Sequence, residues 1–320
     1  MTGYYPFRVG TQAGVFLHME PAGVPTMFPF LSENMRQLDY STYLVGKWHL
    51  GYCKKEFLPT NRGFDYFYGF YGPQTGYFNH SAGMLTAMDF AIGRLVEYLK
   101  TANLYENTVI VFTSDNGGTS NFGASNAPLR GEKDTIWEGG TKTTTFVHSP
   151  KYIEEGGTRE MMFHVVDWHA TILSITGLEI DSYGDGINQW EYIKTGRPKF
   201  RRFQFVYNID NHGSAIRDGD YKLIVGNVDR KMSKDKNRTR LFRISTDPTE
   251  SKDIARNNPK IVRRCIFRVC PLSSILFRLL AKLDQLKKFL HKNVRKPLSL
   301  SGSPERFNGS YSSFWCDGQA

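Results

Sequence analysis

Residues 108–133, with the sequence TVIVFTSDNGGTSNFGASNAPLRGEK, decide the fold of this chain. They open with a short apolar run, residues 109–112, made of β-branched and aromatic side chains. Such a run between turn-forming residues is typical of a strand that is buried on both faces of a sheet. A helical pattern precedes it, and a further strand pattern follows, as in α/β proteins. We therefore expect an α/β domain built around this strand.

An acid and an amide, Asp115 and Asn116, stand where this strand ends, and Gly117 and Gly118 follow them. Open α/β sheets bind ligands just outside the carboxyl ends of their strands. Hard cations prefer carboxylate and amide oxygens, which these two residues supply side by side. The pattern predicts a metal site, although Asn-Gly is also an ordinary turn sequence.

A second strand is expected at residues 43–45, and it leads into residues 46–51, Gly-Lys-Trp-His-Leu-Gly. A spacing of two residues on extended backbone would place Lys47 and His49 on one face. Taken alone, a histidine is more often a packed, hydrogen-bonded residue than a catalyst. The residues themselves leave both interpretations open.

Three potential metal ligands, His164, Asp167 and His169, occur within residues 163–173, FHVVDWHATIL. The same segment has the pattern of a helix that begins near residue 166. We favour a structural role in capping and packing over metal binding for these three side chains.

The rest of the pattern divides the chain into two regions. The other expected elements are helices at 25–40 and 84–99 and strands at 144–148, 203–207 and 241–242. An Asp-Gly pair within residues 216–224 predicts a hairpin turn. We predict a partial α/β domain over residues 1–195, and a smaller antiparallel sheet with a helix over residues 196–320. Residues 64–78, rich in aromatic side chains, are expected to form loops in which packing is favoured over stacking on a sugar.

Length and composition are those of a folded protein with a full core, since 320 residues include 40% hydrophobic side chains. No apolar run reaches the roughly 18 residues of a membrane span, and residues 1–12 lack the apolar centre of a signal peptide. The four cysteines show no CxxC metal spacing, and their disulfide pairing cannot be deduced from the sequence.

The net charge of +10 is local. Residues 256–296 contain twelve Lys or Arg and a single acid, Asp284, and therefore carry +11, so the rest of the chain sums to −1. Such a segment could bind a polyanion. We favour the simpler interpretation, a solvated helix whose apolar stripe packs on the hairpin sheet.

Taken together, several motifs in one order resemble the sulfatases, most closely the arylsulfatase B group of animals. The matching segments are residues 46–51, 112–118, 128–133, 137–140, 216–223 and 241–250. The resemblance implies an alkaline-phosphatase-like mixed sheet flanked by helices, incomplete here, with a smaller C-terminal antiparallel sheet.

The resemblance also implies roles for individual residues. By position, Asp115 and Asn116 would be Ca²⁺ ligands, and Lys47 and Lys133 would grip sulfate oxygens. His49 would hydrogen-bond the nucleophile. Cations and a metal aimed at the sulfuryl oxygens would stabilise the charge that develops there.

Two departures from the family pattern stand out. The family forms its formylglycine nucleophile in a Cys-x-Pro-Ser-Arg motif about ten residues before the counterpart of Thr2-Gly3, and no such motif occurs in these 320 residues. The family also carries a long insert, with the histidine thought to protonate the leaving group, between the counterparts of His80 and Ser81. We expect a chain that lacks its nucleophile, half of its calcium shell and its general acid, although His80 could replace the last.

The sequence therefore predicts a sulfuric-ester hydrolase by descent, acting on sulfated glycans or aryl sulfates and inactive as written. The alternative is a non-catalytic protein that binds sulfated glycans. Nucleic-acid binding ranks last, because no reader motif is present. The resemblance implies a lysosomal or secreted protein, and the oligomeric state is not predicted.

Overall fold

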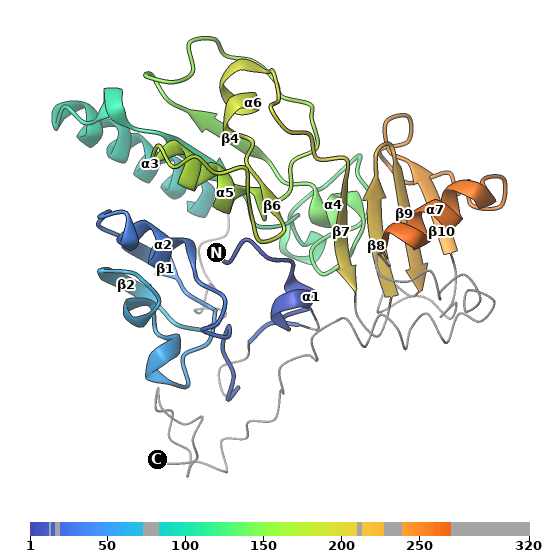
Figure 1. Cartoon of the computed structure of the whole chain (residues 1–320), viewed down its shortest axis with the longest axis horizontal. Helices are drawn as coiled ribbons and strands as arrows, with labels where there is room; N and C mark the ends of the chain where they lie inside the picture. The colour runs from blue at the N-terminus through green and yellow to red at the C-terminus, as the bar shows by residue number, and fades with distance from the viewer. Residues whose placement is uncertain (13, 17–19, 73–82, 210–212, 227–238, 270–320) are drawn as a thin grey trace.

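The computed structural model describes residues 1–12, 14–16, 20–72, 83–209, 213–226 and 239–269, which form a mixed α/β protein (Figure 1). The β1–β2 pair and the four-stranded C-terminal sheet lie at opposite sides of the view, with helices α3 and α5 above the first pair. The amino terminus lies in the middle of the view. Within the described residues, no helix has the length and hydropathy needed to cross a bilayer.

Strands β1 (Tyr43–Lys47) and β2 (Tyr66–Phe70) form a two-stranded parallel sheet. Strand β2 lies within the aromatic segment that we expected to be loops, because aromatic residues pack well on a pleated surface. The core beneath this pair consists mainly of the buried side chains Val9, Val24, Phe30, Trp48 and Phe64.

Helix α2 (Leu31–Gln37) is shorter than the helix expected at residues 25–40. Pro29 explains the difference, since a proline inside a helix removes a hydrogen bond and restricts the residue before it. The carboxylate of Glu33 accepts a hydrogen bond from the N–H of Phe30 at 2.7 Å and so caps the helix.

The central region is built from short elements. They are α1 (Pro6–Val9), η1 (Lys55–Phe57), η2 (Pro59–Asn61), α3 (Gly83–Thr101), η3 (Tyr105–Asn107), β3 (Ile110–Thr113), η4 (Ser120–Phe122), α4 (Glu138–Thr141), β4 (Thr145–His148), α5 (Asp167–Ile175), β5 (Ser182–Tyr183), β6 (Gly186–Ile187) and α6 (Trp190–Thr195). Helices α3 and α5 and strand β4 agree with the sequence-based expectations. Three of the four residues at 137–140, a segment of the family resemblance, lie in the short helix α4.

Strand β3 forms an antiparallel pair with β4, with Val111 opposite Val147. Its expected burial on both faces is wrong, because three of its residues are half-buried and Thr113 is exposed. The ring of Phe112 stacks on the ring of Phe146 in the neighbouring strand, and Phe146 is itself 49% exposed. This contact therefore leaves one face of β3 only partly covered. No other described strand pairs with β3 to cover it further.

The C-terminal sheet confirms the hairpin prediction. Strands β7 (Gln204–Ile209), β8 (Gly213–Asp218), β9 (Tyr221–Gly226) and β10 (Thr239–Arg243) form an antiparallel sheet in the order β10-β9-β8-β7. Gly219 has a φ of +55° in the turn between β8 and β9, a conformation that glycine adopts without strain.

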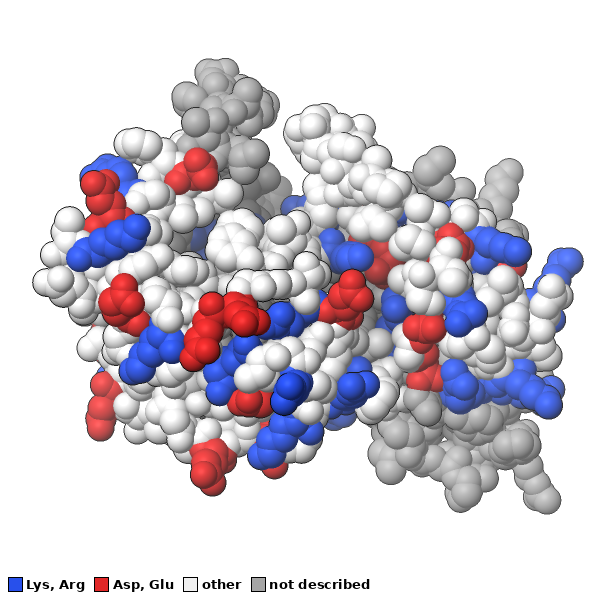
Figure 2. All heavy atoms as spheres, turned by 90° about the horizontal axis from the view of Figure 1, so that it is seen from above, with Lys and Arg blue, Asp and Glu red and all other residues white. Residues whose placement is uncertain are grey.

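Helix α7 (Pro259–Val269) packs its apolar side on this sheet, next to the buried Ile216, Leu223 and Leu241. Its cationic residues Lys260 and Arg263 are exposed, so the described part of the basic segment is a solvated helix face. The stripe expected beyond residue 269 lies outside the described residues. Figure 2 shows that Lys and Arg side chains lie among Asp and Glu side chains over the face drawn there.

Candidate functional site

The loop after β3 is held together by Asn126. Its Oδ1 accepts a hydrogen bond from the N–H of Gly118 at 2.9 Å, and its Nδ2 donates to the carbonyl oxygens of Gly118 and Gly131. The N–H of Lys133 donates to the same Gly118 carbonyl at 3.3 Å. The backbone of Lys133 therefore lies beside the strand end that carries Asp115 and Asn116.

The glycines in this loop are required by close packing of two backbone segments. A Cβ on Gly117 would lie 1.8 Å from the carbonyl oxygen of Gly139, and the N–H of Gly117 donates to Gly140 at 3.0 Å. Any side chain on Gly117 would push the segments apart. The sequence suggested only a turn here, whereas the structure shows a crossing of two chain segments.

Asp115 and Asn116 fit part of a calcium site. Asp115 is exposed, and its carboxylate makes no hydrogen bond or ion pair with any described residue. Asn116 is half-buried, and its Nδ2 donates to the carbonyl of Gly117 at 2.9 Å, which fixes the amide plane. Oxygen donors of this kind suit a hard cation that takes six to eight of them. Across the residues described, no three His, Cys, Asp or Glu side chains gather in a metal-binding group.

Lys47 and His49 do not share one extended face, so that expectation is wrong. Strand β1 ends at Lys47, and His49 has a φ of +53°, in the left-handed region. The His49 Nε2 lies 2.8 Å from the carbonyl oxygen of Phe16. Lys47 is exposed and makes no ion pair with a described residue. Lys47 ends β1 and His49 comes just after it, whereas the loop at residues 115–133 follows β3, which belongs to a separate two-stranded sheet.

A buried ionic cluster fastens this loop to the C-terminal sheet. Lys222 on β9 is fully buried, and its Nζ lies 2.9 Å from Glu138 Oε1 and 2.8 Å from Glu250 Oε1. The Tyr207 hydroxyl donates to Glu138 at 2.7 Å, and the N–H of Glu138 donates to Glu250 Oε2 at 2.7 Å. We call Lys222, Glu138, Glu250 and Tyr207 the Lys222 cluster.

The Lys222 cluster changes the pKa of its carboxyl groups in opposite directions. Burial raises the pKa of Glu250 above its usual value, and the charge of Lys222 only partly opposes it. Burial would also raise the pKa of Glu138, but the charge of Lys222 and a hydrogen bond from Tyr207 together lower it. The surroundings of Glu138 thus favour its charged form, whereas burial disfavours the charged form of Glu250.

Arg130 adds a second link between the loop and the sheet region. Its guanidinium lies 3.7 Å from the centre of the Trp137 ring, and its Nη1 donates to the carbonyl oxygen of Glu250 at 3.2 Å. Trp137 itself packs against Phe242 of β10 in the buried core. The family resemblance singled out residues 128–133 and 137–140 but did not predict that they link the loop to the sheet. For Lys222, the available signal in the sequence was a lysine at a strand position whose side chain faces inward.

His164, Asp167 and His169 have structural roles, as favoured from the sequence. Asp167 is buried; it accepts hydrogen bonds from the N–H of His164 and of Ile187 and pairs with Arg202. The His169 Nδ1 lies 2.9 Å from the Met1 carbonyl oxygen, and its ring stacks on Tyr183 at 3.9 Å. Burial lowers the pKa of His164 to about 3 and that of His169 to about 4.

A protein-family model described as "Sulfatase" matches residues 74–178. Mouse arylsulfatase J is 27% identical over 84% of this chain and 66% of its own length. Human N-acetylgalactosamine-6-sulfatase is 24% identical over 62% of this chain and 56% of its own length. The chain thus spans between about half and two thirds of these relatives.

Solved structures share the fold. The crystal structure of Ps i-CgsB with k-i-k-neocarrahexaose has a TM-score of 0.72 and 22% identity, and covers 90% of this chain and 87% of that one. The sulfatase yidJ from Bacteroides fragilis has a TM-score of 0.63 and 19% identity, over 91% and 85%. These similarities confirm the expected α/β fold of the alkaline-phosphatase type, with its small C-terminal antiparallel sheet.

The Lys222 cluster yields a stability prediction. Replacing Lys222 by Met leaves two buried carboxylates without their cation, which should cost about 3–5 kcal/mol of the free energy of unfolding. That is a large part of the roughly 5–15 kcal/mol typical of a domain. Urea denaturation at pH 7 measures it, with Lys194→Met as control because Lys194 pairs with Glu191 at the surface. A loss no larger than that of the control would contradict the prediction.

The buried histidines yield a prediction for pH. Their pKa values are lowered in the folded state, so below pH 6.5 the unfolded chain binds more protons and stability falls as the pH drops towards 4. The slope should be about 1.4 kcal/mol per pH unit for each histidine. His169→Gln should roughly halve the slope measured by denaturation between pH 6.5 and 4.5, with His148→Gln on β4 as the control. An unchanged slope in His169→Gln would refute this assignment.

Proposed function

This chain is a distant member of the sulfatase family, and we propose that it binds sulfate esters of sulfated glycans at the loop of residues 115–133. The supporting observation is the hydrogen bond from the Lys133 N–H to the Gly118 carbonyl, which brings the backbone of Lys133 next to the segment that carries Asp115 and Asn116. The names of the relatives, arylsulfatases and N-acetylgalactosamine-6-sulfatases, support a sulfate ester as ligand.

The chemistry of the loop suits a sulfate group. Lys133 is exposed and makes no ion pair with a described residue, so its ammonium group can donate to sulfate oxygens. By the family resemblance Lys47, also exposed, would supply a second cation for the same group. A Ca²⁺ ion held by Asp115 and Asn116 would add positive charge against those oxygens. By the family resemblance His49 would hydrogen-bond the nucleophile, and its Nε2 lies 2.8 Å from the carbonyl oxygen of Phe16.

We propose binding without turnover for the 320 residues as they stand. Covalent catalysis needs an attacking group, and no Cys-x-Pro-Ser-Arg sequence occurs among these residues. The three Pro-x-Arg sequences present have Tyr4, Asn126 or Gly302 at the position of the cysteine. The second candidate function is sulfuric-ester hydrolysis, which the names of the relatives favour.

A lysosomal or secreted location is part of the proposal and follows the family resemblance. Three glycosylation sequons, at Asn79, Asn237 and Asn308, suit that route. All three asparagines lie outside the described residues. Mass spectrometry of the protein from a eukaryotic secretory host, with and without glycosidase treatment, tests whether they carry glycans.

A binding measurement with matched variants tests the proposal. Titration with a sulfated oligosaccharide should show about tenfold weaker binding for Lys133→Ala, because one charge-assisted contact is lost. The control is Lys142→Ala, an exposed lysine beyond the loop. The purified chain should not hydrolyse an aryl sulfate above background. Turnover that disappears in Lys47→Ala would instead support the hydrolase.

Calcium affinity tests the partial metal site. With one carboxylate and one amide, we expect a dissociation constant on the order of millimolar or weaker. Titration calorimetry should show this weak binding reduced in Asp115→Ala and unchanged in Asp89→Ala, a surface change on α3. Micromolar affinity that depends on Asp115 would mean that further oxygens complete the shell.

A further inference from the structure

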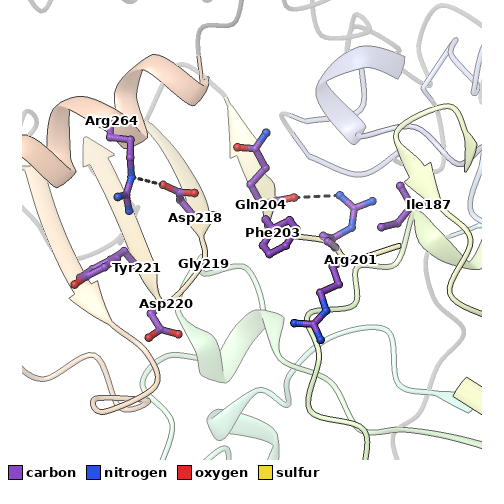
Figure 3. Close-up of a pocket in the computed structure, with 10 residues that line it drawn as sticks. Ile187, Arg201, Phe203, Gln204, Asp218, Gly219, Asp220, Tyr221 and Arg264 are labelled. Carbon is purple, nitrogen blue, oxygen red and sulfur yellow. Dashed lines mark hydrogen bonds and ion pairs between the residues drawn. The ribbon is translucent and has the colours of Figure 1, made fainter. Parts of the chain in front are cut away.

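A groove of about 860 Å³ lies beside the C-terminal sheet, away from the residues so far assigned to sulfate binding. Residues 201–204, at the start of β7, line one side of it, and the turn at residues 218–221 with Arg264 of α7 lines the other (Figure 3). The volume is within the range of small-molecule sites, about 300–1,000 Å³. The groove can therefore hold a ligand larger than a single ion.

The buried charges of the groove are already neutralised. Arg202 is buried; it pairs with Asp167 and donates to the carbonyl oxygen of Asp185 at 2.8 Å. Asp218 is buried as well, and its Oδ2 accepts from Arg264 Nε at 2.8 Å. Arg202 and Asp218 therefore shape the groove with their own charges already paired.

Two guanidinium groups remain open to a ligand. Arg201 is exposed and makes no hydrogen bond or ion pair with the residues that the structure describes. Arg264 contacts Asp218 only through Nε, and its side chain keeps 48% of its surface. Figure 3 shows these two arginines on opposite sides of the groove. An extended anionic ligand could therefore meet a cation at each side.

Aromatic and acidic side chains complete the lining. Phe203 is 62% exposed and lines the groove together with the ring of Tyr221. The exposed ring of Phe203 supplies rigid apolar contact area, which suits the C–H face of a sugar. The Tyr221 ring is half-buried, and the guanidinium of Arg264 lies 5.9 Å from its centre. Asp220 pairs only loosely with Arg243, at 3.6 Å, and its carboxylate can accept hydrogen bonds from hydroxyl groups. Anion, apolar face and hydroxyl groups occur together in an acidic sugar.

We propose that this groove is a second binding site for a sulfated oligosaccharide, separate from the loop at residues 115–133. Arg201 and the terminal nitrogens of Arg264 contact sulfate or carboxylate groups, Phe203 and Tyr221 contact a sugar ring, and Asp220 accepts from a hydroxyl group. The choice of ligand class rests on the proposed function. A second contact along one glycan strengthens binding without any change in the first site.

The test uses a chondroitin sulfate hexasaccharide, with its desulfated counterpart as the reference ligand. Arg201→Ala and Phe203→Ala should each weaken binding of the sulfated ligand about three- to tenfold, and Arg201→Lys should recover part of the loss. Both residues are exposed, so the fold should tolerate these changes. The matched control is Arg94→Ala, which removes an exposed arginine from α3.

Hydrogen exchange on the wild type and on Lys133→Ala separates this groove from the loop. The sulfated ligand should protect residues 201–204 and 218–221 in both proteins, and Arg201→Ala should lose that protection. Protection confined to residues 115–133 would overturn the groove and leave the proposed function standing. Protection confined to the groove would support the groove and overturn the proposed binding at residues 115–133. No protection at either place, with no binding of the sulfated ligand, would contradict both.

Discussion

The ion pairs of Lys222 join β9 to Glu138, which lies 84 residues earlier in the chain, and to Glu250, which lies 28 residues later. A buried lysine is tolerable only when its charge is matched, so the loop bearing Glu138 and the segment bearing Glu250 must both reach β9. Glu250 itself has a φ of +53°, a conformation that its surroundings hold in place. The cluster thus fixes where the candidate sulfate-binding loop lies relative to the C-terminal sheet.

The loop at residues 115–133 depends on this anchorage, because few of its own contacts are apolar. The side chain of Asn126 holds the loop by hydrogen bonds to its backbone, and the N–H of Gly117 donates to the carbonyl oxygen of Gly140. Such bonds are strong only where water is excluded. Trp137 and Arg130 exclude water on one side by packing against the sheet region. Lys133 and Asp115 can therefore stay exposed to a ligand while the backbone beneath them is held.

The C-terminal sheet has two roles in this arrangement. On one side it receives the loop through the Lys222 cluster, and beside β7 and the β8–β9 turn it lines the groove with Arg201 and Arg264. Both places offer arginine or lysine in small numbers rather than one large basic patch, in keeping with the mixed charges in Figure 2. Recognition of a sulfated glycan at separate points would fit such a surface better than bulk attraction of any polyanion.

The sequence by itself determined the elements whose signals are local. These include the apolar run of β3, the Asp-Gly turn before β9 and the periodicity of α3. The assignment of Asp115, Asn116, Lys47 and Lys133 to the candidate site rests on the order of the motifs and stays a prediction. Only the tertiary structure decided the burial of β3, the left-handed backbone at His49, the depth of Lys222, and the groove between residues 201–204 and Arg264. The reason is physical. Side-chain periodicity and turn chemistry act over a few residues, whereas charge pairing, burial and close backbone approach depend on segments that are far apart in the chain.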